Sequence, residues 1–223
     1  MKRLTGFLAL ALVIYSIVMT LAVWGFPKRG PRYQIVQPVL TLELSRDADE
    51  LSNLLDVDDA RGKLRYDTHL DNFFIPTYDA FLLSAIWLIG SGTSGRIRKL
   101  FPAAILIAVL AALCDGLENY NIFIALSAPQ ITDALSAAIR HPSQLKWFFL
   151  FTGYLLTALF LLTRTGRIFS QTTTFILAMM LATAGVVGYI GLLFCRNALP
   201  VSSLLFAALP ILSLRFLRKQ KES

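Results

Sequence analysis

Two carboxylates and an amide stand at helical spacing near the end of a long apolar segment. Asp115, Glu118 and Asn119 occupy positions i, i+3 and i+4, so a helix projects all three side chains from one face. Ionisable side chains inside an apolar segment are costly unless they are paired, hydrated or functional. Two such carboxyl groups can exchange protons as an acid–base pair, or they can supply oxygen ligands to a cation.

A second polar cluster lies where the preceding apolar segment begins. Asp71 and Tyr78 are seven residues apart, which is two turns along one helix face. Pro76 lies between them and removes a backbone donor, so a helix is expected to begin or to kink there. The two clusters together predict a ligand-binding site made of Asp71, Tyr78, Asp115, Glu118 and Asn119.

The composition predicts that these clusters belong to a membrane protein. The 223 residues are 56% hydrophobic and 16% charged, whereas soluble domains are usually about a quarter charged. Several apolar segments reach the roughly 20 residues that a helix needs to cross the hydrocarbon core of a bilayer. The net charge of +7 comes from short basic tracts beside these segments, a pattern typical of topology signals, so no nucleic-acid partner is expected.

We therefore expect an all-α integral membrane bundle of about six transmembrane helices, forming one domain over residues 1–223. The first apolar segment is too long for a usual signal peptide, so it is expected to stay as an uncleaved span. Residues 27–72 carry leucines at helical spacing and are expected to form an external loop of amphipathic helices. The expected spans are residues 5–26, 73–90, 101–125, 147–163, 172–194 and 198–214.

Two further segments carry helix signals. Residues 126–146 are expected to hold a short interfacial helix that ends near Arg140 and Pro142. The fifth span has a small residue at every third position, which predicts a seam for close helix packing, with a substrate groove as the alternative. These small residues are Ala182, Gly185, Gly188 and Gly191.

The distribution of positive charge predicts the orientation of the spans. Lys and Arg outnumber acidic residues at the amino terminus, in the loops 91–100 and 164–170, and in the carboxyl tail. The positive-inside rule places these segments, and so both termini, in the cytoplasm. Both polar clusters then lie together at the outer leaflet, which is the main reason to treat them as one site.

A structural interpretation stands beside the functional ones. Carboxylates near the interface can be neutralised by basic side chains on the same side, and Asn119 and Tyr78 can complete a hydrogen-bond network. The cluster then holds the bundle together and binds no ligand. The basic residues expected on that side are Arg61, Lys63, Arg65, Arg140 and Arg196.

A cation site and an acid–base site are the chemical alternatives. Asp71, Asp115 and Glu118 offer the oxygen ligands that calcium and magnesium prefer, so a divalent cation is a candidate cofactor. His69 and His141 fall on the same side, but neither has the spacing of a metal-binding motif. No other catalytic motif accompanies the pair Asp115 and Glu118, so the sequence leaves open whether the chain is an enzyme.

The two clusters resemble a pattern shared by a broad set of uncharacterised bacterial multi-span membrane proteins. In that family a DxxFxxxY motif enters one helix and a DxxEN motif leaves the next. The resemblance covers roughly residues 40–125 and implies a bacterial inner-membrane protein, with no particular activity. The residues that carry it are Glu43, Leu44, Asp71, Phe74, Tyr78, Asp115, Glu118 and Asn119.

The sequence favours a small binding or accessory membrane protein. We expect its polar pocket in the outer leaflet to engage a membrane lipid, a cation or a partner membrane protein. The first alternative is a membrane-embedded enzyme that acts on a lipid-like substrate through Asp115 and Glu118. The second is a small transporter, which six spans without an evident inverted repeat disfavour.

Overall fold

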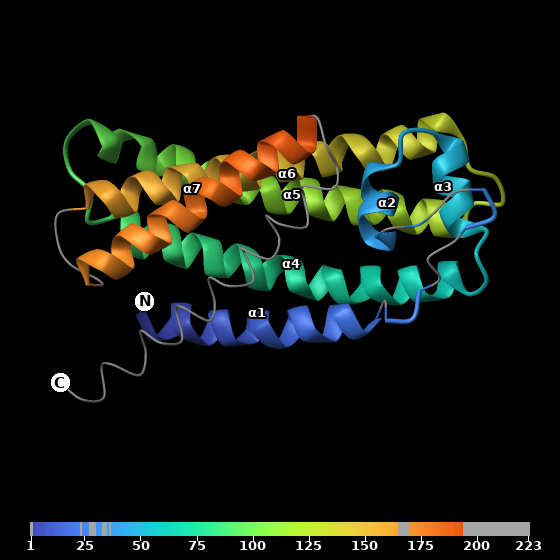
Figure 1. Ribbon diagram of the computed structural model, residues 1–223, viewed down its shortest axis with the longest axis horizontal. Coiled ribbons are helices and arrows are strands. Elements are labelled where there is room, and N and C mark those ends of the chain that lie inside the picture. Colours follow the sequence, from blue (N-terminus) through green and yellow to red (C-terminus); the bar gives the residue numbers. More distant parts are fainter. Residues whose placement is uncertain are drawn as a thin grey trace. The chain divides into compact units, whose positions relative to one another are not determined.

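The computed structural model describes residues 2–22, 24–26, 30–32, 35, 37–164 and 170–193, and helices dominate it (Figure 1). Over these residues the expected all-α class is confirmed, since no strand occurs and an isolated bridge pairs Thr93 with Arg164. A 3-10 helix, η1 (Gly95–Leu100), precedes α5. The α-helices are α1 (Lys2–Ala22), α2 (Pro38–Leu44), α3 (Ala48–Leu55), α4 (Ala60–Gly90), α5 (Phe101–Ser127), α6 (Asp133–Thr163) and α7 (Gln171–Leu193).

Five helices are long and apolar enough to cross a membrane: α1, α4, α5 with η1, α6 and α7. The expected sixth span, residues 198–214, lies outside the described residues, as does Arg196. With 31 residues each, α4 and α6 are about 46 Å long, which exceeds the roughly 30 Å of a hydrocarbon core. Both helices can therefore carry their polar amino-terminal turns beyond the apolar part of a bilayer.

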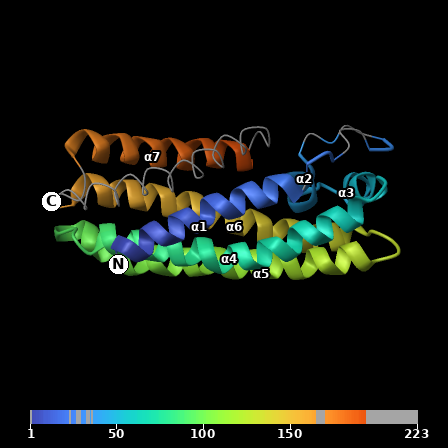
Figure 2. The ribbon, with the colours of Figure 1, turned by 90° about the horizontal axis from the view of Figure 1, so that it is seen from below.

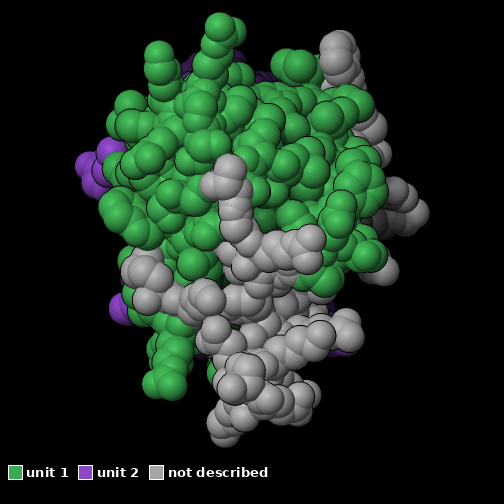
Figure 3. All heavy atoms as spheres, turned by 90° about the vertical axis from the view of Figure 1, so that its left-hand side faces the viewer, with its two compact units in different colours: residues 1–14, 76–111, 147–223 green, residues 15–75, 112–146 purple. Residues whose placement is uncertain are grey.

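The chain forms two compact units, coloured separately in Figure 3. Unit 1 comprises Met1–Ile14, Pro76–Ala111 and Trp147–Ser223, and unit 2 comprises Tyr15–Ile75 and Ala112–Lys146. Within unit 2, the first part of α4, the last part of α5 and the first part of α6 run side by side (Figures 1 and 2). Four chemically informative residues, Asp71, Asp115, Glu118 and Asn119, fall in this unit.

Unit 2 has a hydrophobic core of its own. Helix α3 is closed at its start by the side chain of Asp47, which accepts the N–H of Glu50 at 2.8 Å. Its leucines are fully buried against residues from the ends of α4, α5 and α6, so α3 packs as a cover over these helix ends. The buried core includes Leu51, Leu54, Leu55, Leu64, Ile122, Ala125 and Ile139.

Helix α6 is longer than the sequence predicts. It runs from Asp133 to Thr163 through Pro142, so the expected short interfacial helix and the expected span 147–163 are one helix. Pro142 has no N–H, which leaves the carbonyl of Ala138 without its usual donor. The side-chain amide of Asn121 on α5 donates to that carbonyl at 2.8 Å, and this contact replaces the missing helical bond.

Helix α4 is also continuous across its proline. It begins at Ala60 and continues through Pro76 to Gly90, so the expected span 73–90 is only its second half. The polar first half belongs to unit 2 and the apolar second half, from Pro76 onward, belongs to unit 1. The beginning of α4 therefore carries Asp71 as part of a long helix rather than at the start of a span.

The small residues of α7 pack closely against α6 in unit 1, as the seam interpretation predicts. A Cβ atom on Gly188 would overlap the ring of Phe151, and one on Gly185 would meet the side chain of Leu155. These glycines are buried, and their lack of a side chain allows the two helices to approach. At Gly185 and Gly188 the packing seam is confirmed, and a substrate groove is excluded at these two positions because side chains of α6 fill the space.

Replacing Gly188 by Ala is expected to lower the free energy of unfolding by about 1–3 kcal/mol, because the new methyl group overpacks the contact with Phe151. Gly153→Ala is the matched control: nothing lies within 4 Å of its added Cβ, so the change should be neutral or stabilising by up to about 1 kcal/mol. Thermal unfolding of the detergent-purified variants measures both. Equal losses would contradict the packing seam.

Candidate binding site around Lys146

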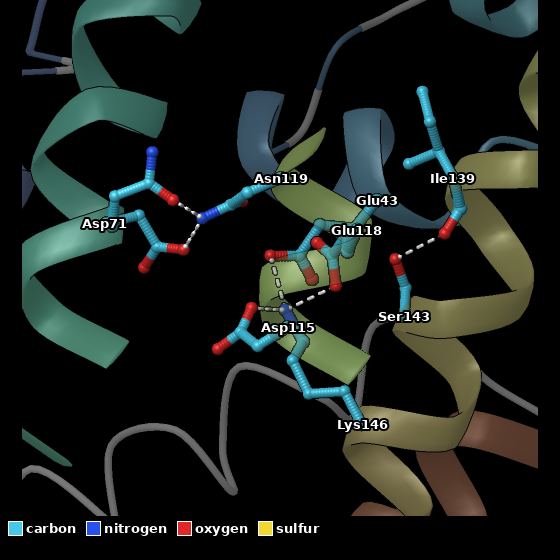
Figure 4. A network of polar contacts seen from close by, with 9 residues as sticks. Glu43, Asp71, Asp115, Glu118, Asn119, Ile139, Ser143 and Lys146 are labelled. Atoms are coloured by element: carbon cyan, nitrogen blue, oxygen red, sulfur yellow. Dashed lines mark hydrogen bonds and ion pairs between the residues drawn. The ribbon is translucent and has the colours of Figure 1, made fainter. Parts of the chain in front are cut away.

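A buried group of polar side chains lies in unit 2, where α2, α4, α5 and α6 contribute residues (Figure 4). At its centre is the ammonium group of Lys146, on α6, whose side chain is only 6% exposed. The Nζ atom lies 3.2 Å from Oε1 of Glu43, 3.1 Å from Oδ1 of Asp115 and 2.8 Å from Oε2 of Glu118. One cation thus binds three carboxylates; we call these four residues the Lys146 cluster.

The helices position the members of this cluster by their periodicity. Asp115 and Glu118 project from the same face of α5, as their spacing predicts, and both are buried. Glu43 lies near the end of α2 between two buried leucines, Leu42 and Leu44, so this short helix directs it inward. Lys146 reaches the same point because α6 continues through Pro142.

Asn119 connects the Lys146 cluster to α4. Its Nδ2 atom donates to Oδ2 of Asp71 at 2.8 Å and to Oδ1 of Asn72 at 3.1 Å. Asp71 is half-buried and interacts electrostatically with Asp115 and Lys146, whereas Asn72 is exposed. The structure therefore brings together four of the five predicted ligand residues: Asp71, Asp115, Glu118 and Asn119.

Tyr78, the fifth predicted residue, belongs to unit 1, where it is buried with 3% of its surface exposed. Two helical turns separate it from Asp71 along α4, and the boundary between the units falls between the two residues. The site described here therefore consists of unit 2 residues alone.

A further carboxylate is buried one turn before Asp71 on α4. Asp67 is 5% exposed, and its Oδ1 atom has no hydrogen-bond partner among the described residues. The negative charge of Glu43 repels the Asp67 carboxylate. Among the described residues, three carboxylates contact the ammonium group of Lys146, and two further carboxylates interact electrostatically with members of the cluster; the five are Glu43, Asp115 and Glu118, then Asp67 and Asp71.

The basic side chains expected to neutralise the carboxylates have other roles. Arg61 donates to the carbonyl oxygens of Ala125, Leu126 and Ala128, and so closes the carboxyl end of α5. Arg140 donates to the backbone carbonyls of Ser45 and Arg46, at the end of α2. Arg61 and Arg140 thus bind backbone carbonyls, and the carboxylates are bound by Lys146, a basic residue that the structural interpretation did not name.

Sequence reasoning missed Lys146 and gave Glu43 no role of its own. Lys146 directly precedes the apolar segment 147–163. A single charged residue at the start of an apolar segment could have identified it as a candidate partner of the buried carboxylates. Pro142 concealed it, because a proline predicts that the helix ends before Lys146. Glu43 entered only through the family resemblance, and its position between Leu42 and Leu44 was the available sign that it points inward.

The geometry of the Lys146 cluster does not favour the predicted divalent cation between Asp115 and Glu118. Within the described ranges, no three His, Cys, Asp or Glu side chains are arranged to hold a metal ion. The ammonium of Lys146 lies between Asp115 and Glu118, where their expected metal ligation would occur. The His69 ring packs at a tilt of 49° against Phe123 with ring centroids 4.7 Å apart, so its described contact is with an aromatic ring rather than a carboxylate.

Replacing Lys146 by Met is expected to lower the free energy of unfolding by about 3–5 kcal/mol, because three carboxylates lose their shared counter-charge while staying buried. Lys99→Met, on the exposed η1 helix, is the matched control and should change little. Adding Glu118→Gln to Lys146→Met should recover part of the loss, which a double-mutant cycle in detergent measures. A mild effect of Lys146→Met would contradict the cluster.

No protein-family model matches the chain, and neither a curated protein nor a solved structure matches it. The resemblance to the family with DxxFxxxY and DxxEN motifs therefore stays a prediction based on those short motifs. Function has to be argued from the chemistry of the site itself.

Proposed function

We propose that this chain is a multi-pass membrane protein that binds a small cation at Asp71, the accessible edge of the Lys146 cluster. The observation that carries this proposal is that, among the described residues of unit 2, more buried carboxylates than ammonium groups gather around Lys146. Each buried, ionised carboxylate costs several kcal/mol unless a positive charge compensates it. An added proton or metal ion lowers that cost, so the cluster favours its uptake.

Burial of the carboxylates supports a cation over the other two ligands that the sequence suggested, a membrane lipid and a partner membrane protein. Glu118 and Asp115 are 1% and 4% exposed, so a lipid headgroup or a protein partner cannot touch them. Asp71 is half-buried beside the exposed Asn72, and this is the accessible edge of the site. The side-chain amide of Asn119 donates a hydrogen bond to Oδ2 of Asp71. The Oδ1 atom of Asp71 makes no hydrogen bond to the described residues, so it can bind a small cation.

The acid–base alternative has less support. Asp115 and Glu118 both contact the ammonium of Lys146, and neither is reachable by a lipid-like substrate. A general acid or base must come within hydrogen-bonding distance of the group that it protonates or deprotonates. A transporter, in contrast, would use the same cation site, so that role is compatible with the proposal without being required by it.

We place the protein in the bacterial inner membrane with six spans, both termini in the cytoplasm and the site near the outer leaflet. Support comes from the five helices that are long and apolar enough to span, and from the basic tracts of the predicted cytoplasmic segments. On α4 and α6 a polar site residue is followed by an apolar stretch. Asp71 precedes the stretch that begins at Phe73, and Lys146 precedes the stretch that begins at Trp147. That order is typical of a membrane interface.

The proposal is tested by thermal unfolding of the detergent-purified protein in separate titrations with Na⁺, K⁺, Mg²⁺, Ca²⁺ and protons. We expect one of these cations to stabilise the wild type, by about 2.7 kcal/mol at a concentration 100 times its Kd. Asp71→Asn should weaken that response at least tenfold, because it removes the accessible carboxylate. Asp58→Asn, an exposed position before α4, is the isosteric control and should respond like the wild type.

If the proton is the cation, lowering the pH stabilises the wild type more than Asp71→Asn over the same range. A stability that responds identically in the wild type and Asp71→Asn, for all five cations, would overturn the proposal. The Lys146 cluster would then be a structural ion-pair network.

A further inference from the structure

Unit 2 carries a second candidate site on its surface, made of residues outside the Lys146 cluster. An open groove of about 420 Å³ follows the last turns of α5, and its lining is almost entirely apolar. Its lining residues are Tyr120, Phe123, Ile124, Ser127 and Ala128. Tyr120 and Ile124 are 64% and 43% exposed, so no other described part of unit 2 covers them.

The groove continues an apolar stripe along α5. Leu113 and Leu117 are 64% and 53% exposed and precede Tyr120 at helical spacing. Over the eight residues from Tyr120 the groove extends about 12 Å along the helix axis, which suits a stretch of acyl chain. Exposed tyrosines such as Tyr120 and Tyr66 are typical of the level where a bilayer meets water.

Two side chains of α4, Arg65 and His69, make one edge of the apolar groove polar and basic. Arg65 donates from Nη2 to Oγ of Ser127 at 2.9 Å, and the His69 ring packs at a tilt against Phe123. Both side chains are exposed, and they stand four residues apart on one face of α4. The Nε and Nη1 atoms of Arg65 make no hydrogen bond to the described residues, so the guanidinium group can bind an anion.

We propose that this groove binds one anionic phospholipid, with an acyl chain on the apolar lining and the phosphodiester at Arg65 and His69. The combination of an apolar lining and a positive edge is complementary to a negatively charged amphiphile. A soluble phosphate compound would leave the apolar lining uncovered. A second copy of the chain would need roughly 1,000 Å² of interface, which five lining residues do not supply.

The test uses the full chain in detergent micelles, titrated with dioleoyl phosphatidylglycerol and read by native mass spectrometry. Dioleoyl phosphatidylcholine, with the same chains and no net charge, and glycerol 3-phosphate, with no chains, are the comparison ligands. We expect one phosphatidylglycerol to bind more tightly than phosphatidylcholine. Glycerol 3-phosphate should not compete with it.

Arg65→Gln should weaken phosphatidylglycerol binding about tenfold and phosphatidylcholine binding by less, because the choline ammonium of phosphatidylcholine already offsets the charge of its phosphodiester. Lys63→Gln is the matched control: it removes the same charge from the same helix, about 200° away around the axis. Ile124→Trp fills the groove and should weaken both lipids. Leu145→Trp, a change at a comparably exposed position on α6 outside the groove lining, should weaken neither.

Three results would overturn the proposal. Equal binding of phosphatidylglycerol by the wild type and Arg65→Gln would remove the role of the positive edge. Competition by glycerol 3-phosphate would indicate a soluble anion as the ligand. A dimer that Ile124→Trp dissociates, without lipid binding, would assign the groove to a second copy of the chain.

Discussion

The ion pairs of Lys146 are the interaction on which the arrangement of unit 2 depends. An ammonium group has three protons, and here it lies near three carboxylates from α2 and α5, one of them 103 residues away in sequence. Such a contact is favourable only where water is excluded and the geometry is complete. It therefore requires that α2, α5 and α6 pack in one register, with α3 covering the helix ends.

That requirement explains why α6 continues through a proline. If the helix ended at Pro142, Lys146 would not be held at the depth of Asp115. The amide of Asn121 replaces the lost backbone bond at Ala138, so the interruption costs less than the roughly 3 kcal/mol typical of a proline inside a helix. A local defect in α6 is thus compensated by a polar side chain on its neighbour, in the same unit as the ion pairs.

Local periodicity predicted part of the site, and tertiary contacts decided the rest. The spacing of Asp115, Glu118 and Asn119 was sufficient, because helical geometry fixes their common face. The proximity of Asp71 was predicted because α4 and α5 are consecutive antiparallel helices, so the first turns of α4 are expected beside the last turns of α5. Lys146 was not predictable in this way, since its role depends on a helix that crosses Pro142 with the help of a residue from another helix.

Helix α4 carries basic and acidic side chains on different faces. Arg65 and His69 form one row, and Asp67 and Asp71 form a second row displaced by two residues, about 200° around the helix. The basic row contacts the end of α5, whereas the acidic row belongs to the interior beside Glu43 and Asn119. Because the rows face different surroundings, the arginine does not neutralise the buried carboxylates. Buried carboxylates on one face of α4 therefore coexist with a basic edge on another, and the proposed cation and the proposed anionic lipid rest on these two separate features.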